Sequence, residues 1–211
     1  LWDAATHVFK LIKSKNLHSK TWITKSTVSV GTAEKLIEIR NNMGLNEKDV
    51  QIVSNPEFLR EGSAVHDFFH PDRIVIGSEN NAAKVVLDKL YRPLHLRDVP
   101  IVHTQLQTAE LAKYASNSFL ATKISFINEI CNLCEAFGAD VKDISKIMGM
   151  DKRIGEFFLH PGPGYGGSCF PKDVKALSHL FNQAKIEGRI VKATQLANIA
   201  QQERSFDIIN T

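Results

Sequence analysis

A glycine-rich segment with a single cysteine, residues 162–173 (GPGYGGSCFPKD), combines the residue types best suited to chemistry. Its four glycines allow backbone amides to approach a ligand closely. Pro171 suits the first turn of a helix, so we expect a helix to begin directly after Cys169. The positive end of that helix's macrodipole, together with Lys172, favours a thiolate. Cys169 is therefore a candidate nucleophile, and a structural cysteine packed after a glycine turn is the alternative.

Two other functions for this segment have to be weighed. Glycines 162, 164 and 167 match G-x-G-x-x-G, but a dinucleotide loop requires a preceding strand inside a βαβ unit. Residues 156–161 lie between predicted helices and end in proline, so the context disfavours that loop. A cysteine hydrolase is the other alternative, and it would need a histidine placed as the base.

Lys113 and Asn117 form a second candidate pair. They are four residues apart, so a helix places them on one face. Leu106, Leu120 and Ile124 share this face, which directs both polar groups toward a packed interior. A buried lysine needs a partner or a chemical role. The alternative is a lysine at the helix edge whose ammonium reaches solvent.

A third candidate segment, residues 55–62 (NPEFLREG), directly follows a predicted strand. The carboxyl ends of parallel strands are where α/β sheets place their ligand sites. Glu57 and Glu61, with Arg60 between them, could serve acid–base chemistry. An exposed charged turn is the alternative for this segment.

The sequence predicts no metal site. Cys131 and Cys134 form a C-x-x-C inside a predicted helix, with no second pair and no histidine cluster, which favours core packing over zinc or redox chemistry. The eight histidines show no ligand spacing.

The elements that must position these residues fall into two parts. In the first hundred residues, strands alternate with helices, which predicts βαβ units and a mainly parallel sheet. We expect strands at 21–28, 50–53, 73–77 and 99–102, and helices at 3–17, 32–42 and 82–90. The remainder is predicted to be all helical, with one long helix or two over 105–137 and further helices at 141–148, 174–184 and 190–209. We place the boundary near His103, giving domains 1–103 and 104–211.

Composition excludes several classes of protein. Hydrophobic residues make up 43% and charged residues 23%, a globular balance. The net charge of +3 is spread along the chain without a dense basic block, so no nucleic-acid partner is expected. No apolar stretch approaches the roughly 18 residues of a membrane span. Three cysteines are too few for a disulfide scaffold, which favours reduced thiols and a cytoplasmic location. Both ends interrupt an element, so we expect a piece of a longer protein.

Five segments closely resemble motifs of the UDP-glucose/GDP-mannose dehydrogenase family, in the family's order and spacing. They are KSTVSVG at 25–31, NPEFLREG at 55–62, ELAKYASN at 110–117, DKRIG at 151–155 and GPGYGGSCFPKD at 162–173. Ser29 stands where the family usually has proline. The resemblance implies the C-terminal part of a Rossmann-like NAD-binding domain followed by the central helical dimerisation domain. By that map the chain begins after the G-x-G-x-x-G fingerprint and ends before the UDP-binding domain.

The resemblance also implies an activity. The family's UDP-glucose 6-dehydrogenases oxidise UDP-glucose to UDP-glucuronate with two NAD, as homodimers joined through the central domain. GDP-mannose and UDP-N-acetylmannosamine dehydrogenases are the alternatives, although segments 55–62 and 166–173 look most like the UDP-glucose branch. We expect these 211 residues alone to form an inactive dimerisation core.

Roles for individual residues follow from the same resemblance. Cys169 would be the nucleophile, Lys113 and Asn117 the oxyanion stabilisers, and Asp173 and Glu57 the residues that orient or activate water. Thr27 and Glu61 would help to hold water and cofactor. The implied cofactor contacts are Ser26, Thr27, Val28, Glu61 and Cys169. The implied substrate contacts are Glu57, Phe58, Leu59, Arg60, Glu61, Lys113, Asn117, His160, Gly164, Tyr165, Gly166, Gly167 and, reaching the neighbouring subunit's substrate, Arg153.

Overall fold

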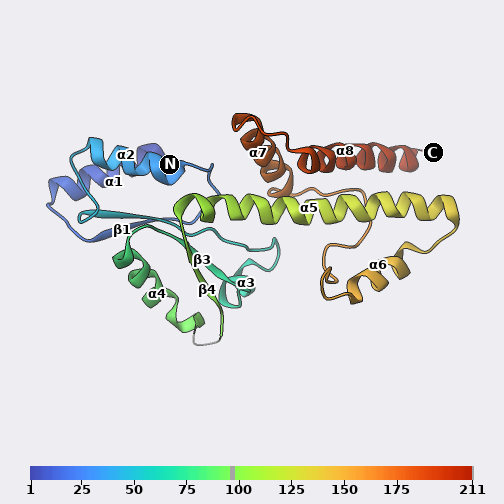
Figure 1. Cartoon of the computed structure of the whole chain (residues 1–211), viewed down its shortest axis with the longest axis horizontal. Helices are drawn as coiled ribbons and strands as arrows, with labels where there is room; N and C mark the ends of the chain where they lie inside the picture. The colour runs from blue at the N-terminus through green and yellow to red at the C-terminus, as the bar shows by residue number, and fades with distance from the viewer. Residues whose placement is uncertain (96–97, 211) are drawn as a thin grey trace. The chain divides into compact units, whose positions relative to one another are not determined.

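The computed structural model describes residues 1–95 and 98–210 (Figure 1). It divides into two compact units, Leu1–Lys113 and Tyr114–Thr211. The division falls within α5 (Leu106–Phe137), which is one uninterrupted helix rather than two. No helix among the described residues is long and apolar enough to cross a membrane.

The first unit is built around a four-stranded sheet in the order β1-β2-β3-β4. The strands are β1 (Lys20–Thr24), β2 (Val50–Ser54), β3 (Ile74–Gly77) and β4 (Ile101–Thr104). β1 pairs with β2, and β3 with β4, in parallel. β2 and β3 meet through one antiparallel bridge between Ser54 and Gly77, so the sheet is mainly parallel, as predicted. The last residues of all four strands are therefore register partners in a row.

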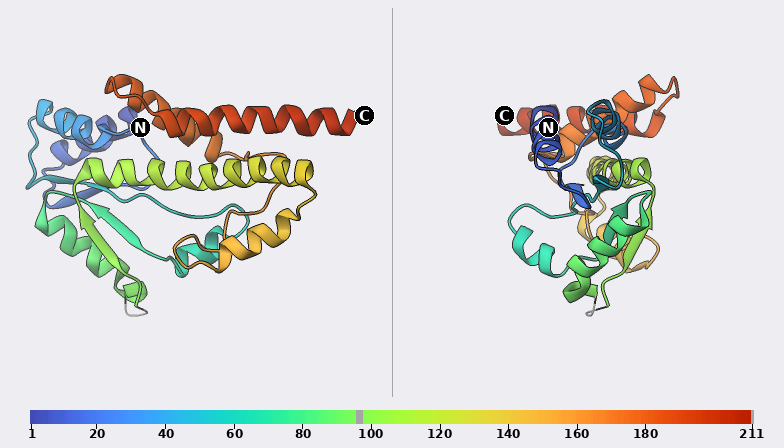
Figure 2. Two further views of the ribbon diagram at one scale, coloured as in Figure 1. Left: turned by 45° about the vertical axis from the view of Figure 1, so that its right-hand side comes forward. Right: turned by 90° about the vertical axis from the view of Figure 1, so that its left-hand side faces the viewer.

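Helices cover both faces of this sheet, as an α/β fold requires (Figure 2). The helices are α1 (Trp2–Ser14), α2 (Thr32–Asn42), α3 (Ala64–Phe69) and α4 (Asn81–His95). Side chains alternate along a strand, and β2 shows this in its packing. Val50 and Ile52 join a core with α1 and α2, whereas Val53 joins a second core with α4 and β3. The short helix α3 was not predicted, because six residues are too few to show helical periodicity.

The second unit is helical, as predicted. After α5 come α6 (Val141–Met150), α7 (Phe170–Gln183) and α8 (Arg189–Asn210). α8 runs alongside α5, held by hydrogen bonds that include Thr122 to Thr194 and Asn132 to Gln201 (Figure 2). The core of this unit packs Ala121 of α5 and Val174 of α7 around Tyr165 of the glycine-rich segment.

Candidate active site

Cys169 lies at the N-cap of α7, the position predicted from Pro171. Its side chain is half-buried, with Sγ 3.5 Å from the hydroxyl of Ser168. The Asp173 N–H donates to the Cys169 carbonyl at 2.9 Å and so closes the first turn of α7. Cys134, in contrast, is buried in α5. The sulfur of Cys169 therefore lies at a helix start and is not sealed in a core, which is the position that a nucleophile needs.

Asp173 is completely buried one turn into α7 and has two side-chain donors. Asn117 Nδ2 and Lys172 Nζ each lie 2.6 Å from its carboxylate oxygens. Burial opposes the positive charge on Lys172, but the hydrogen bond to Asp173 and the negative charges near Lys172, that of Asp173 foremost, together outweigh burial and raise the pKa of the Lys172 ammonium. Two of the predicted catalytic residues, Asn117 and Asp173, are thus in direct contact, and Asp173 lies one helical turn after Cys169.

Lys113 belongs to the first unit, where its side chain is only 3% exposed. Its ammonium lies 3.3 Å from Oε1 of Glu57 and 5.4 Å from the centre of the Phe58 ring. The Phe58 ring has a second cationic neighbour, because the Arg73 guanidinium lies 3.8 Å from the same ring centre. The buried lysine therefore has an anionic partner, and it is not a helix-edge lysine reaching into solvent.

Lys25 is a further cation near this ion pair, and the sequence did not single it out as a site residue. Its ammonium lies 5.7 Å from the centre of the Tyr91 ring. Burial lowers the pKa of Lys25, the charge of Glu57 opposes this shift, and the charge of Lys113 adds to it. Glu57 therefore interacts electrostatically with two ammonium groups, those of Lys113 and Lys25.

A small cleft opens at the carboxyl ends of β1 and β2. Ser26, Thr27 and Val28, three of the predicted cofactor contacts, line it together with Lys113. Its other lining residues are Thr24, Ser54, Pro56 and Glu110. The place is the one where open α/β sheets bind nucleotides, and its hydroxyls and ammonium are suitable partners for the polar edge of a dinucleotide. Glu61, the remaining predicted cofactor contact in this unit, lies on an exposed turn and is not among the residues that line the cleft.

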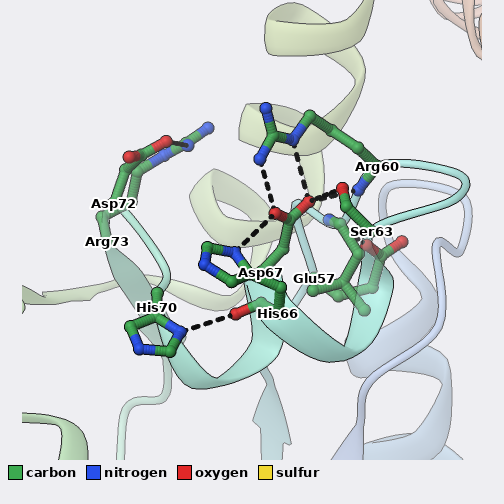
Figure 3. A network of polar contacts seen from close by, with 9 residues as sticks. Glu57, Arg60, Ser63, His66, Asp67, His70, Asp72 and Arg73 are labelled. Atoms are coloured by element: carbon green, nitrogen blue, oxygen red, sulfur yellow. Dashed lines mark hydrogen bonds and ion pairs between the residues drawn. The ribbon is translucent and has the colours of Figure 1, made fainter.

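Arg60 forms an ion pair with Asp67, an acid that was not predicted as a site residue (Figure 3). Its Nε and one terminal nitrogen donate to the two oxygens of Asp67, at 2.9 and 2.6 Å. The Arg60 backbone N–H and the Ser63 hydroxyl also donate to Asp67. These bonds from Arg60 hold the pKa of the Asp67 carboxyl well below its usual range. Arg60 therefore fastens the 57–63 turn to α3 and does not line the cleft.

Within this turn Leu59 has a further contact, because its N–H donates to Oε2 of Glu57 at 2.6 Å. Glu57 thus has one oxygen near Lys113 and the other bound by the backbone of its own segment. These contacts fix the direction of the Glu57 carboxylate.

The glycine-rich segment is held by two asparagines that sequence reasoning missed. Asn198 of α8 accepts from the Tyr165 N–H at 2.6 Å and donates to the Tyr165 carbonyl. Asn128 of α5 accepts from the Gly162 N–H at 2.8 Å. Gly164 has φ +110°, and a Cβ there would lie 2.6 Å from Asn198 Oδ1. The amides of 162 and 165 are therefore already bonded, while Gly166 and Gly167 are exposed.

Two predicted substrate contacts lie on the surface of the second unit. Arg153 forms an ion pair with Asp151 at 2.6 Å and is otherwise exposed. His160 is exposed as well. Over residues 1–95 and 98–210, no group of three or more histidine, cysteine or acidic side chains could hold a metal ion.

The α/β unit, with its polar cleft at the strand ends, has the form of a dinucleotide-binding domain. Residues 2–95 match the NAD binding domain of the UDP-glucose/GDP-mannose dehydrogenase family, and residues 107–200 match the central domain of the same family. The two matches account for most of the chain, which belongs to the UDP-glucose/GDP-mannose dehydrogenase family.

Individual relatives agree with this assignment. A UDP-glucose 6-dehydrogenase from Rickettsia conorii is 48% identical over 211 residues, covering 100% of this chain and 47% of that protein. The solved structure of a UDP-glucose dehydrogenase from Pyrobaculum islandicum matches 94% of this chain and 45% of its own, with a TM-score of 0.84 at 40% identity. That of a GDP-mannose dehydrogenase from Pseudomonas aeruginosa matches 99% and 48%, with a TM-score of 0.67 at 30% identity. The chain spans about half the length of these relatives.

Proposed function

We propose that this chain is the catalytic middle of an enzyme that oxidises UDP-glucose to UDP-glucuronate with two NAD. The observation that carries the proposal is the position of Cys169 at the start of α7, one turn before a buried Asp173 that binds Asn117. The relatives that are named as UDP-glucose dehydrogenases support UDP-glucose as the substrate. Identity to the UDP-glucose enzymes, 48% and 40%, exceeds the 30% found for the GDP-mannose enzyme, which is the second candidate.

A nucleophile at Cys169 would allow an alcohol to be oxidised in two steps to a carboxylic acid. NAD, when bound, accepts the hydrides removed from C6 of the sugar. The aldehyde made first cannot give up a second hydride as it stands. The Cys169 thiolate therefore adds to its carbonyl carbon and forms a thiohemiacetal, which can. Oxidation of that adduct gives a thioester on Sγ. Water then adds to the thioester carbon, the C–S bond breaks, and the acid and the free thiol are released.

Lys113 and Asn117 would stabilise the oxygen that becomes negative in the adduct. Both present nitrogen donors from buried positions, where a charge-directed hydrogen bond is stronger than in water. One such donor contributes about 3 kcal/mol to a transition state of this kind. The contact with Asp173 fixes the direction of the Asn117 amide.

Glu57 and Asp173 differ as candidates to orient the hydrolytic water. Both oxygens of Asp173 are bonded and the residue is fully buried. The Glu57 side chain is 25% exposed, so it can reach a water molecule. We therefore assign the water to Glu57, and to Asp173 the orientation of Asn117 and Lys172.

The cleft at the strand ends would hold part of the cofactor. This proposal is supported by the lining of the cleft, which Ser26, Thr27 and Val28 share with Lys113. These residues offer the polar contacts that a nicotinamide ribose or amide needs. These lining residues include no glycine fingerprint for the pyrophosphate.

The homodimer expected for the family has a suitable surface on α5. Phe119, Phe126 and Leu133 follow one another at intervals of seven residues, and all three are exposed. Seven-residue spacing places them in one stripe along the helix, as in helices that pair. Large apolar side chains exposed along one stripe are typical of an interaction site. We infer that a second copy of the chain covers this stripe. Separately, three free cysteines favour a reducing compartment, and we propose a cytoplasmic location.

Replacing the nucleophile tests the proposed reaction. In the protein made from the complete coding sequence, we expect two NADH and one UDP-glucuronate per UDP-glucose. Cys169→Ser should form no UDP-glucuronate, because a serine hydroxyl does not replace the thiolate. Cys131→Ser, at a half-buried position in α5, is the matched control and should keep the activity. Undiminished acid production by Cys169→Ser would contradict the proposal.

The 211-residue chain alone tests the inactive-core expectation. Sedimentation should show a dimer, and a nicotinamide absorbance assay should show no turnover. Turnover by this chain alone would show that the cofactor and the substrate need no further residues.

A further inference from the structure

Glu110 is a buried carboxylate to which the proposed reaction assigns no role. It lies in the second turn of α5 and is 4% exposed. Its Oε2 accepts from the Gly31 N–H at 2.8 Å. Its Oε1 accepts from the Ala33 N–H at 2.9 Å and from the Ser54 hydroxyl at 3.2 Å. One side chain therefore joins α5 to the start of α2 and to the end of β2.

The start of α2 depends on this distant side chain. The first N–H groups of a helix have no partner inside the helix, and a side chain at the N-cap usually accepts from one of them. Gly31 is the N-cap, with φ +94°, and has no side chain to do so. Glu110 supplies both acceptors from 77 and 79 positions along the chain. Its negative charge also lies at the positive end of the α2 macrodipole.

The surroundings of Glu110 disfavour the charged form of its carboxyl group. Burial raises the pKa of Glu110, the hydrogen bonds from Gly31 and Ala33 oppose that shift, and the charge of Glu34 adds to it. A capping side chain at position 31 itself would be strained, because the backbone there has φ +94°. The acceptor therefore comes from another part of the chain. By capping α2 from a distance, Glu110 also connects α2 to α5, which a local cap would not do.

That connection has a consequence for the cleft. Lys113 is three residues after Glu110, so both side chains lie on the same side of α5. Both line the cleft together with Ser26, Thr27 and Val28, which lie shortly before Gly31, the N-cap of α2. We propose that Glu110 is a positioning residue that fastens the cofactor-side loop, residues 26–31, to the helix that carries Lys113. This inference rests on the proposed function for its consequence in catalysis, but not for the anchor itself.

Hydrogen exchange tests the anchor without any activity. In Glu110→Gln the NH2 group replaces either the oxygen that accepts from Gly31 or the one that accepts from Ala33 and Ser54, so one of these two backbone amides should exchange at least about tenfold faster. Glu38→Gln, an exposed acid on α2, is the matched control and should exchange like the wild type. Glu110→Asp keeps the charge but is one methylene shorter, and should lose protection at one of the two amides. Wild-type exchange at both amides in Glu110→Gln, or in Glu110→Asp if the first variant does not fold, would overturn the anchor.

Steady-state kinetics of the complete protein test the positioning role. Glu110→Gln should raise KM for NAD roughly tenfold and lower kcat, with KM for UDP-glucose within about twofold of the wild type. A loss of folded protein alone would lower kcat and leave both KM values unchanged. An unchanged KM for NAD in a variant whose amides have lost protection would overturn the positioning role. A wild-type protein without dehydrogenase activity would overturn the proposed function instead, and the exchange result would still decide the anchor.

Discussion

Asn117 and Asp173 are 56 positions apart in the chain, and their side chains meet at 2.6 Å between Nδ2 and Oδ2. Both are buried, one on α5 and the other on α7. Each was predicted as a catalytic residue from a different segment of the sequence. Their contact means that the amide proposed to stabilise an oxyanion is held in place by a carboxylate in the first turn of the helix that follows Cys169.

Removing the Asn117 amide should destabilise the chain. In Asn117→Ala the buried Asp173 loses one of its two side-chain donors, which is expected to lower the free energy of unfolding by about 1–3 kcal/mol. Urea unfolding followed by circular dichroism measures the change. Asn182→Ala, at an exposed position on α7, should leave the midpoint unchanged. Equal midpoints for the two variants would show that the contact contributes no stability.

The Arg60–Asp67 pair should make stability depend on pH in acid. Because the pKa of Asp67 is depressed in the folded chain, its ionised form stabilises the fold above the unfolded pKa of about 3.9. That stabilisation is lost as pH falls from about 4 through the folded pKa. Asp67→Asn should therefore be less stable than the wild type at pH 6, and the difference should shrink at pH 3. A difference that stays constant between these pH values would contradict the assignment.

Gly77 should not tolerate a side chain, although its backbone conformation is an ordinary one. A Cβ at this position would lie 2.6 Å from Ala109 Cβ and 2.8 Å from the Gln105 carbonyl oxygen. Gly77→Ala must therefore push the first turn of α5 away from the end of β3, and we expect a loss of about 1–3 kcal/mol. Gly162→Ala is the control, because nothing lies within 4 Å of its added Cβ. A melting temperature of Gly77→Ala equal to that of the wild type would contradict the close packing.

The apolar stripe of α5 should control self-association. Phe126 lies in the middle of the stripe, and a symmetric dimer presents it twice. Phe126→Ser should weaken the dimer by roughly a hundredfold in dissociation constant if each copy contributes about 1–2 kcal/mol. Sedimentation velocity over a concentration series measures this, with Val85→Ser, an exposed apolar residue on α4, as the control. Undiminished dimerisation of Phe126→Ser would place the interface elsewhere.

Local patterns were enough to predict most of the elements. The helix expected over 32–42 is α2 with the same bounds, and Pro171 correctly placed a helix start after Cys169. The 33 residues without glycine or proline formed the single helix α5. Such features depend on neighbours within a few positions, which is why composition and periodicity suffice for them.

The partners of the buried polar groups were decided by the tertiary structure. Asp67 and Asn198 lie in no motif, and Glu110 begins one without a predicted role, yet each accepts hydrogen bonds from backbone N–H groups of the candidate site. The donors of Glu110 and Asn198 lie 33 to 79 positions away. By itself the sequence determined which residues could do chemistry and which segments would be helix or strand. Only folding decided which side chains hold those residues, because a buried N–H must find an acceptor among groups that packing brings near.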